Sequence, residues 1–369
     1  MRSRIPPVEE KSVLNHRTSE GIFIHENADD MPHLPVGPFT GSPDGETIWG
    51  FECDPELRGD KGPLRISSDG GQTWDSPGTF LPDSGLDSAP TGAFTCTENG
   101  TLVAAFSNKA GRANWDWDPE LKDSPGARLP TCVVRSLDGG ETWQDLQTLH
   151  EEWTGANRDI IQTSDGRLVF TSMKLRHQPG RHTCLTYFSN DDGKTWQPSN
   201  VIDLGGNGHH DGVTEATLVE LEDGRLLKYM RTNWGQFWRA LSEDGGEHWH
   251  PYGPSSVDAS SAPGMLKRLD SGRIALLWNR WCAEGKDDVE LRGGDGMWSA
   301  TPASNYREEL SISFSEDECQ SWSPPVVIAR NEGSEVSYPV AYEAEPGILW
   351  ITAHRWRLRM RIREADFLR

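Results

Sequence analysis

Short apolar stretches recur along the whole chain, and many of them follow a turn that contains glycine. The stretches GRLVFTS after Asp165 and GRLLKYM after Asp223 are two examples. A two-residue turn with glycine between such runs is typical of a β-hairpin. The pattern therefore predicts an all-β chain with hairpins at six turns: Asp44-Gly45, Asn99-Gly100, Asp165-Gly166, Asp223-Gly224, Ser271-Gly272 and Pro346-Gly347.

A motif that begins with serine and ends with tryptophan alternates with these hairpins. It reads SLDGGETW from Ser136, and close copies begin at Ser67, Ser189, Ser242 and Ser315. Repetition at such intervals indicates an array or a propeller. Ser and Asp side chains can bond nearby backbone N–H groups, and glycine permits positive φ, so the motif predicts a self-supporting turn covered by its Trp. The last copy has Cys319 in place of glycine, and we expect that turn to be more strained or differently shaped.

Six hairpins and five box motifs together predict a six-bladed β-propeller of four-stranded sheets. The missing sixth box is explained if the ring closes by joining the two chain ends in one blade. We expect the alternating stretch 21–25 to supply the outer strand of the last blade, which contains Trp350. We also expect one propeller domain over residues 1–369, with a polar segment at 1–20.

Boxes of the form S-x-D-x-G-x-x-W on a six-bladed propeller resemble those of the sialidase (neuraminidase) superfamily, also called BNR or Asp-box proteins. The resemblance extends from about residue 30 to the end of the chain. The boxes are specific for the fold. They say less about activity, because Asp boxes also occur in lyases, other glycosidases and binding propellers.

The fourth hairpin carries the most specific site prediction. Residues at equal distances from a hairpin turn face each other across the two strands. Glu215 and Arg231 are each eight residues from Asp223, so we expect them to be near neighbours at one strand end. The arrangement resembles the sialidase motif that carries the glutamate partner of the nucleophile and the second of three substrate-binding arginines. A structural salt bridge at the end of a sheet is the alternative.

Further site residues are assigned through the same resemblance. Arg307 begins the pattern R-x-x-L-x-I before the fifth box and resembles the third arginine, with Arg280 as the alternative. Tyr338, in the last hairpin, resembles the nucleophilic tyrosine and is preferred to Tyr342. Hairpin counting places His354 opposite Tyr338, where the family often has a glutamate.

The first blade departs from the family pattern. In sialidases an R-I-P motif leads directly into the inner strand of that blade, which we expect to begin close to His33, so His33 matches the first substrate-binding arginine. Asp54 and Asp60 lie in the region of the family's acid/base aspartate, and the sequence does not separate them. Because His33 and His354 replace fixed charges, we expect a site that is sensitive to pH near neutrality.

Two more features point to the mouth of the site. A long insertion at 109–129 contains Trp115 and Trp117, and loops of this length are usually functional or disordered. Its aromatic and acidic content favours a pocket wall. Arg158 lies ahead of the third hairpin, at the strand end where the central cup should open, and is a further candidate for substrate binding.

Composition narrows the partners. The net charge of −21 argues against a nucleic-acid partner. The 6 cysteines lack paired spacing and are expected to be reduced thiols, and no metal-ligand spacing is present, so we expect neither metal nor cofactor. No long apolar run opens the chain, so we expect no membrane span, and a location that is cytoplasmic, or secreted if a signal peptide is absent from this chain.

The resemblance implies a definite chemistry. Sialic acids carry a carboxylate on the anomeric carbon, and a neutral phenol next to a glutamate attacks that carbon without like-charge repulsion. Arginine suits the clamp because its planar fork pairs a carboxylate bidentately. The sequence thus predicts an exo-acting, sialidase-type hydrolase of a terminal acidic sugar: Tyr338 is the nucleophile, Glu215 its base partner, Arg231 and Arg307 the clamp, and Asp54 or Asp60 the general acid.

Two other classes of protein stay open. A polysaccharide lyase, or a His-dependent glycosidase, could use the same basic cup on uronic-acid glycans, and the histidines around the cup favour it. A non-catalytic glycan-binding propeller would bind without turnover and would tolerate Tyr338→Phe.

Overall fold

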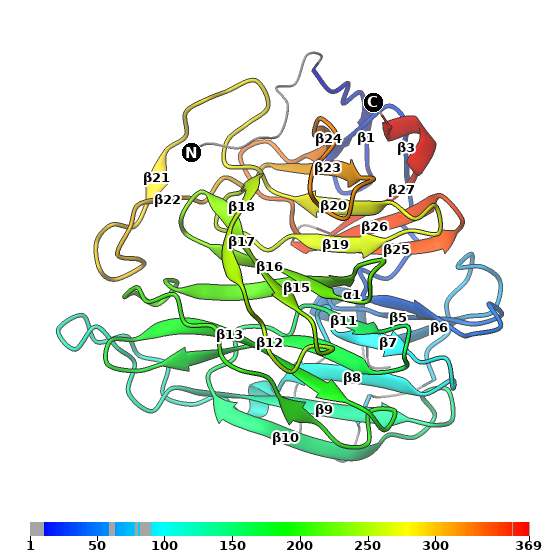
Figure 1. The fold of residues 1–369 in the computed structure, drawn as a ribbon. Helices are drawn as coiled ribbons and strands as arrows, with labels where there is room; N and C mark the ends of the chain where they lie inside the picture. Colours follow the sequence, from blue (N-terminus) through cyan, green and yellow to red (C-terminus); the bar gives the residue numbers. More distant parts are fainter. Residues whose placement is uncertain (1–10, 59–62, 78–79, 82–89, 356, 369) are drawn as a thin grey trace.

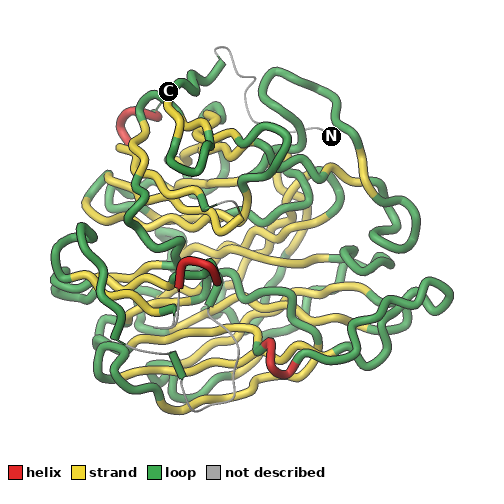
Figure 2. The backbone as a smooth tube through the Cα atoms, turned by 180° about the vertical axis from the view of Figure 1, so that it is seen from behind, coloured by secondary structure: helices red, strands yellow, loops and turns green. Residues whose placement is uncertain are grey.

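The computed structural model describes residues 11–58, 63–77, 80–81, 90–355 and 357–368. In that part of the chain, antiparallel sheets stand around a central axis like the blades of a propeller (Figure 1). Strands make up most of the regular structure. Helix is confined, in the described ranges, to α1 (Pro55–Arg58) and two 3-10 turns, at Lys109–Gly111 and Glu364–Phe367 (Figure 2).

Each blade is built outward from an inner strand. From the inner to the outer edge, blade one has β4 (Phe39–Gly41), β5 (Ile48–Phe51) and β6 (Leu64–Ser67), and blade two has β7 (Phe94–Cys96), β8 (Leu102–Ser107), β9 (Arg128–Ser136) and β10 (Gln144–Glu152). Blade three has β11 (Ile160–Gln162), β12 (Leu168–Arg176), β13 (Arg181–Ser189) and β14 (Gln197–Pro198), and blade four has β15 (Val213–Glu220), β16 (Leu226–Thr232), β17 (Gln236–Ser242) and β18 (Tyr252–Asp258). Blade five has β19 (Met265–Arg268), β20 (Ile274–Trp278), β23 (Glu309–Ser315) and β24 (Val326–Arg330), and blade six has β25 (Ser337–Glu345), β26 (Ile348–Arg355), β27 (Leu358–Arg363) and β3 (Ala28–Asp30).

The inner strands close the ring. Contacts run from β4 to β7, β11, β15, β19 and β25 and return from β25 to β4. All six predicted glycine turns join the first two strands of their blades. Gly166 and Gly224 have φ of 87° and 81°, the conformation for which glycine is favoured. The six-bladed β-propeller predicted from the sequence is therefore confirmed.

The box motifs form the turns after the third strands, as predicted. In the turn between β9 and β10, Ser136 Oγ donates to Asp138 Oδ1 at 2.7 Å and accepts from Gly140 N at 2.9 Å. Asp138 Oδ1 also accepts from Thr142 N at 2.8 Å. The same serine and aspartate bonds recur in the other boxes, so each turn carries its own hydrogen-bond frame.

The fifth box keeps this shape with residues that strain it. Glu318 and Cys319 have φ of 58° and 62°, and Cys319 N still donates to Ser315 Oγ at 2.9 Å. Positive φ is unfavourable for residues with a Cβ. The expected strain is therefore present, and the expected change of shape is not.

Ring closure uses a different segment from the one predicted. β3 pairs with β27 and supplies the outer strand of blade six. The stretch around β2 (Phe23–Ile24) instead pairs with β24 and extends blade five, with β1 (His16–Arg17) beyond it. Ile22 and Ile24 are buried in a core cluster shared by blades five and six. Alternation alone could not decide between the two sheet edges, because both accept an antiparallel strand.

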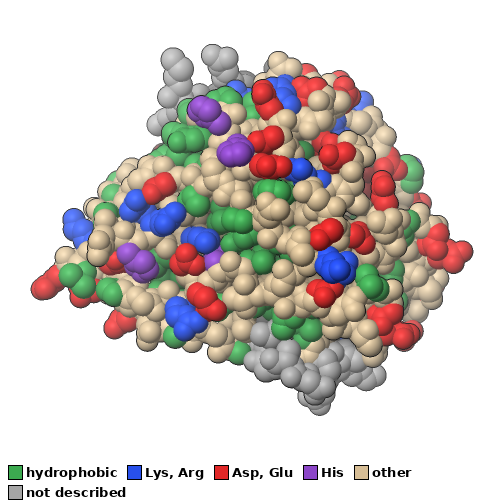
Figure 3. Space-filling model, turned by 60° about the horizontal axis from the view of Figure 1, so that its bottom comes forward, with side chains coloured by type: hydrophobic (Ala, Val, Ile, Leu, Met, Phe, Trp, Pro, Cys, Tyr) green, Lys and Arg blue, Asp and Glu red, His purple; other side chains and the backbone are tan. Residues whose placement is uncertain are grey.

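The surface agrees with the composition. On the face in Figure 3, Asp and Glu side chains are scattered over the surface with Lys and Arg among them. A small sheet of β21 (Leu291–Arg292) and β22 (Ala303–Ser304) forms within the insertion of blade five and projects from the ring (Figure 1). Among the described residues, no helix is long and apolar enough to cross a membrane.

Candidate active site

The predicted site residues that come together do so at the strand ends opposite the hairpin turns. Glu215 and Tyr338 lie near the starts of inner strands β15 and β25, and Arg231 lies near the end of β16. Arg158 and Arg307 each lie two residues before a strand, β11 and β23 respectively. The propeller thus gathers side chains from blades three, four, five and six at one end of its axis.

Glu215 and Arg231 form a buried ion pair, as hairpin counting predicted. Arg231 Nη1 donates to Glu215 Oε2 at 2.5 Å, and the side chains are 5% and 8% exposed. The register that pairs Glu220 with Leu226 and Ala216 with Met230 places Glu215 opposite Arg231 when continued by one residue, and it shifts only before Val213 is reached. Burial disfavours both charges, but the nearby partners outweigh it: the pKa of Glu215 is lowered by Arg231 and then Arg158, and the pKa of Arg231 is raised by Glu215.

Tyr338 stands beside this pair. Its hydroxyl oxygen lies 3.4 Å from Arg231 Nη1, the same nitrogen that binds Glu215. Its backbone has φ of 64°, an uncommon value for a bulky residue in a strand. Such local strain persists only where the surroundings hold it and is concentrated at functional sites.

Three guanidinium groups surround the Tyr338 ring. The Cζ atoms of Arg158, Arg307 and Arg355 lie 5.2, 5.6 and 5.7 Å from the ring centroid. These distances are within the range of cation–π attraction. The end of the cup around Tyr338 is therefore strongly cationic although the whole chain is acidic.

The guanidinium group of Arg158 binds backbone carbonyl oxygens. It is 2% exposed, and its two terminal nitrogens donate to Thr91 O at 2.8 Å and Pro339 O at 3.0 Å. Burial lowers its pKa. Because Pro339 follows Tyr338, Arg158 fixes the strand that carries the tyrosine, and this role accounts for its donors better than direct substrate binding.

Arg307 reaches the same site and also borders a large pocket. Its Nη2 donates to Ser261 O at 2.6 Å, and its Nη1 lies 3.3 Å from Glu335 Oε2. The pocket, of about 910 Å³, is also lined by His210, Trp298 and Glu308. This is space of the size that a small glycan needs.

His354 lies opposite Tyr338 in the register that hairpin counting predicted. The flanking pairs are Ser337 with Arg355 and Pro339 with Ala353, and the two rings are 4.9 Å apart. Burial, followed by Arg158 and Arg355, lowers the pKa of His354 to about 3. The predicted pH sensitivity near neutrality is therefore wrong for His354, because a buried imidazole next to cations stays neutral there.

The remaining predicted residues lie elsewhere. His33 is exposed and precedes the inner strand, which begins at Phe39 and not close to His33 as expected. Asp54 pairs with Arg357, and Arg280 pairs with Asp258 at 3.2 Å, so Arg307 and not Arg280 faces Tyr338. Asp60 lies outside the described residues.

The rim of the cup is aromatic, as the first insertion suggested. Trp115 stacks on Trp153 with ring centroids 4.1 Å apart, and its edge faces His209. His209 in turn contacts His210, which stacks on Trp298 at 5.4 Å. Segments of blades two to five thereby make one continuous wall.

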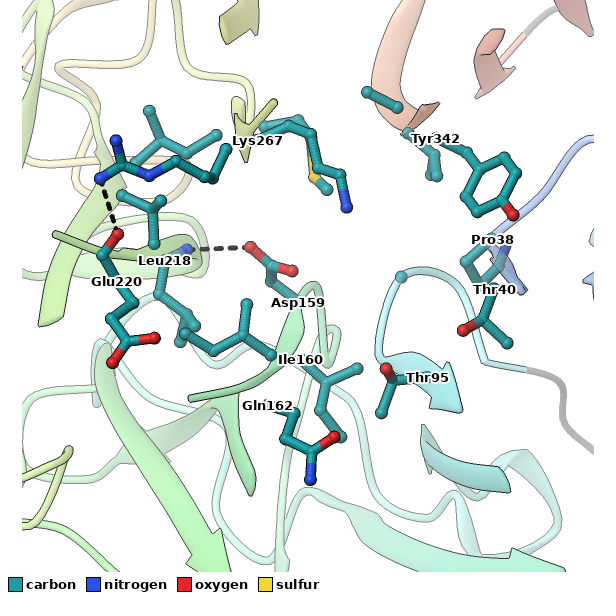
Figure 4. Close-up of a pocket in the computed structure, with 18 of the residues that line it drawn as sticks. Pro38, Thr40, Thr95, Asp159, Ile160, Gln162, Leu218, Glu220, Lys267 and Tyr342 are labelled. Atoms are coloured by element: carbon teal, nitrogen blue, oxygen red, sulfur yellow. Dashed lines mark hydrogen bonds between the residues drawn. The ribbon is translucent and has the colours of Figure 1, made fainter. Parts of the chain in front are cut away.

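A second pocket occupies the axis at the hairpin-turn end. It measures about 650 Å³ and is lined by residues of all six inner strands, including Asp159, Lys267 and Tyr342. Figure 4 shows the Asp159 carboxyl group and the Lys267 ammonium group pointing into it, with Tyr342 at the far side. Asp159 Oδ2 accepts from Thr217 Oγ1 and Leu218 N at 2.6 and 2.9 Å. Tyr342 thus belongs to this second pocket and not to the Tyr338 site.

Three residues of the site were missed by the sequence reasoning. Ser261 Oγ accepts from Arg231 Nη2 at 2.9 Å, while Glu335 and Arg355 lie beside Arg307 and Tyr338. The last two could have been found, because Glu335 directly precedes the last inner strand and Arg355 follows His354. Nothing in the sequence pattern marks Ser261. Among the described residues, no group of three or more His, Cys, Asp or Glu side chains could hold a metal ion.

The ring of six blades and the repeated turns define an Asp-box propeller of the sialidase fold. The chain belongs to the BNR repeat-like domain family, which matches residues 65–351. It is 27% identical over 298 residues to a sialidase of Bacteroides fragilis, covering 74% of this chain and 50% of that protein. It is also 27% identical over 255 residues to a sialidase of Micromonospora viridifaciens, covering 62% of this chain and 37% of that one. The chain thus spans half or less of the length of these curated relatives.

Solved structures agree on the fold. A protein of unknown function from Dyadobacter fermentans superposes with a TM-score of 0.60 at 17% identity, covering 97% of this chain and 98% of that one. A Hadza microbial sialidase superposes with a TM-score of 0.58 at 18% identity, covering 89% of this chain and 66% of that one.

Proposed function

We propose that this protein is a sialidase-type exo-glycoside hydrolase that removes a terminal acidic sugar through Tyr338 as nucleophile. The observation that carries the proposal is the convergence of Tyr338, Glu215 and Arg231 on one nitrogen: Arg231 Nη1 lies 2.5 Å from the glutamate and 3.4 Å from the tyrosine hydroxyl. The names of the relatives support the same reaction class.

The chemistry follows from the charges. The lowered pKa of Glu215 keeps it ionised at neutral pH, the state that a proton acceptor needs. Tyr338 attacks the anomeric carbon, the bond to the leaving oxygen breaks, and water later hydrolyses the tyrosyl-linked sugar. A neutral phenol suits a sugar whose carboxylate would repel an Asp or Glu nucleophile. We assign the carboxylate to Arg307 and the general acid to one of the two sequence candidates, Asp54, which pairs with Arg357, or Asp60.

The pocket beside Arg307 suggests how the substrate lies in the site. The 910 Å³ pocket beside Arg307 opens between the aromatic wall and the blade-five insertion. We place the sugar at Tyr338 and the rest of the glycan in this pocket. We propose an exo mode of action, in keeping with the sialidases that the chain resembles.

The test is release of fluorophore from an aryl sialoside by the wild type, Tyr338→Phe and Tyr342→Phe. Loss of the nucleophile should reduce kcat by about a hundredfold or more. Tyr342→Phe should retain activity because Tyr342 lines the second pocket and is not part of the Tyr338 site.

Equal activity of the two variants would contradict Tyr338 as nucleophile. Without turnover of any sialoside, uronic-acid glycans become the next substrates to assay, and an unsaturated product would identify a lyase. His354, with a pKa of about 3, is a poor proton acceptor for that lyase at neutral pH.

A further inference from the structure

Glu335 is a carboxylate held among the arginines of the site. Its Oε2 lies 3.3 Å from Arg307 Nη1 and its Oε1 lies 3.6 Å from Arg355 Nη1. Ser337 Oγ donates to Oε2 at 3.0 Å. The side chain is 25% exposed and lines the 910 Å³ pocket.

The two arginines that Glu335 contacts border the pocket side of the site, although Arg307 is only 13% exposed and its Nη2 is held by Ser261 O. Arg355 is 54% exposed, and Arg307 lines the pocket. Arg158 and Arg231 are buried, and their terminal nitrogens already bind Thr91, Pro339, Glu215 and Ser261. A ligand carboxylate near Tyr338 therefore meets Arg307 and Arg355 first, and finds Glu335 already there.

We propose that Glu335 competes with the carboxylate of the ligand for Arg307 and Arg355, and that Arg355 completes the clamp in place of the missing first arginine. This inference rests on the proposed acidic substrate. The Arg355–Glu335 pair is long and exposed and therefore weak, so an incoming carboxylate can take over these guanidinium donors while Glu335 turns toward the pocket solvent. Ser337 holds Glu335 in the competing position when no ligand is bound.

Such a competitor lowers the affinity for an acidic ligand and leaves the affinity for a neutral ligand unchanged. The carboxylate of a charged sugar forms ion pairs with Arg307 and Arg355 that replace those lost by Glu335. A neutral sugar offers no charge in return and leaves the internal pairs in place. Affinity for acidic ligands is thereby kept moderate, which favours release of an acidic product.

The experiment measures calorimetric binding of N-acetylneuraminic acid and of its uncharged methyl ester to four proteins: the wild type, Glu335→Gln, Ser337→Ala and Glu308→Gln. We expect Glu335→Gln to bind the acid about three- to tenfold more tightly, with no change for the ester. Ser337→Ala keeps the charge of Glu335 and removes its anchor, so it should shift the acid affinity in the same direction by a smaller factor.

Glu308→Gln is the matched control. Glu308 lines the same pocket, and its removal takes away one negative charge without touching the arginine contacts of Glu335. A gain there equal to that of Glu335→Gln would overturn the proposal, because a general field effect would then explain both. Weaker or unchanged binding of the acid by a folded Glu335→Gln, or no binding of the acid by any of the four, would also overturn it.

The two proposals fail separately. If Glu335→Gln binds the acid more tightly but none of the four proteins hydrolyses an aryl sialoside, the proposed role of Glu335 stands and the proposed hydrolase activity is wrong. If the protein hydrolyses the sialoside and Glu335→Gln gains no affinity, the hydrolase stands and the competitor is wrong. Should Glu335→Gln not fold, Ser337→Ala decides alone.

Discussion

Tyr338 is the residue at which backbone and site chemistry meet. Its φ of 64° would be costly in an ordinary strand. Arg158 fixes the next carbonyl, and His354 packs against the ring, so the surroundings hold the strained conformation. A rigid nucleophile is an advantage, because reacting groups must keep near-attack geometry.

Lys228 shows the opposite case, a charged residue that the site does not use. It is fully buried in β16, and Nζ has no hydrogen-bond partner and lies 4.1 Å from the centroid of the Trp249 ring. Burial lowers its pKa from 10.5 to about 8. The ammonium form is thus penalised in the folded state at neutral pH.

We therefore predict that Lys228→Met stabilises the protein at pH 7 by about 1–3 kcal/mol, since Met keeps the packing and removes the charge. Between about pH 8 and 10.5 the unfolded state binds more protons than the folded state, so wild-type stability from this group rises with pH. The advantage of the variant should shrink from pH 7 to pH 10 in urea unfolding.

Lys194→Met is the control, because Lys194 is exposed. It should change the free energy of unfolding by no more than about 0.5 kcal/mol at either pH. A destabilised Lys228→Met at pH 7 would mean that the cation–π contact with Trp249 outweighs the cost of burial.

For the individual elements, the length of a hairpin decides which cross-strand residue pairs can be predicted from the sequence. The pairs Glu215 with Arg231 and Tyr338 with His354 could be predicted because both hairpins are long and a tight turn fixes their register. The same counting failed at His33, because β4 and β5 are short and their pairing ends before that residue. Register is informative only where the ladder continues.

The box turn is the element that the sequence specifies most completely. Ser136 is fully buried, and its hydroxyl both donates to Asp138 and accepts from Gly140 N. Ser136→Ala leaves that N–H without its partner, so we predict a loss of about 1–3 kcal/mol in the free energy of unfolding, measured by urea denaturation.

Leu137→Ala in the same turn is the comparison, because Leu137 is 57% exposed. Its effect should stay within about 0.5 kcal/mol. Similar losses in the two variants would show that the turn does not depend on the buried hydroxyl.

For the whole molecule, the repeats made the fold predictable. Which residues come together in the site could be predicted only in part. Each box and each glycine turn is local, so its physics is readable in a few residues. Glu335 and Arg355 become site residues because distant blades bring Arg307 and Tyr338 beside them. The closing strand was misplaced for a related reason: β2 and β3 are both only two or three residues long, and the choice of sheet edge depends on the finished ring.

The packing between blades five and six gives the last prediction. Ile24 is 1% exposed in β2 and packs in the cluster that joins blades five and six. Ile24→Ala should cost about 2–5 kcal/mol of unfolding free energy through the cavity it leaves, whereas Val13→Ala, at a 44% exposed position, should cost less than about 0.5 kcal/mol. Because a closed ring couples its blades, thermal unfolding of Ile24→Ala followed by tryptophan fluorescence and by circular dichroism should give one shared, lowered midpoint. Two separate midpoints would show that blades five and six can open while the rest of the propeller stays folded.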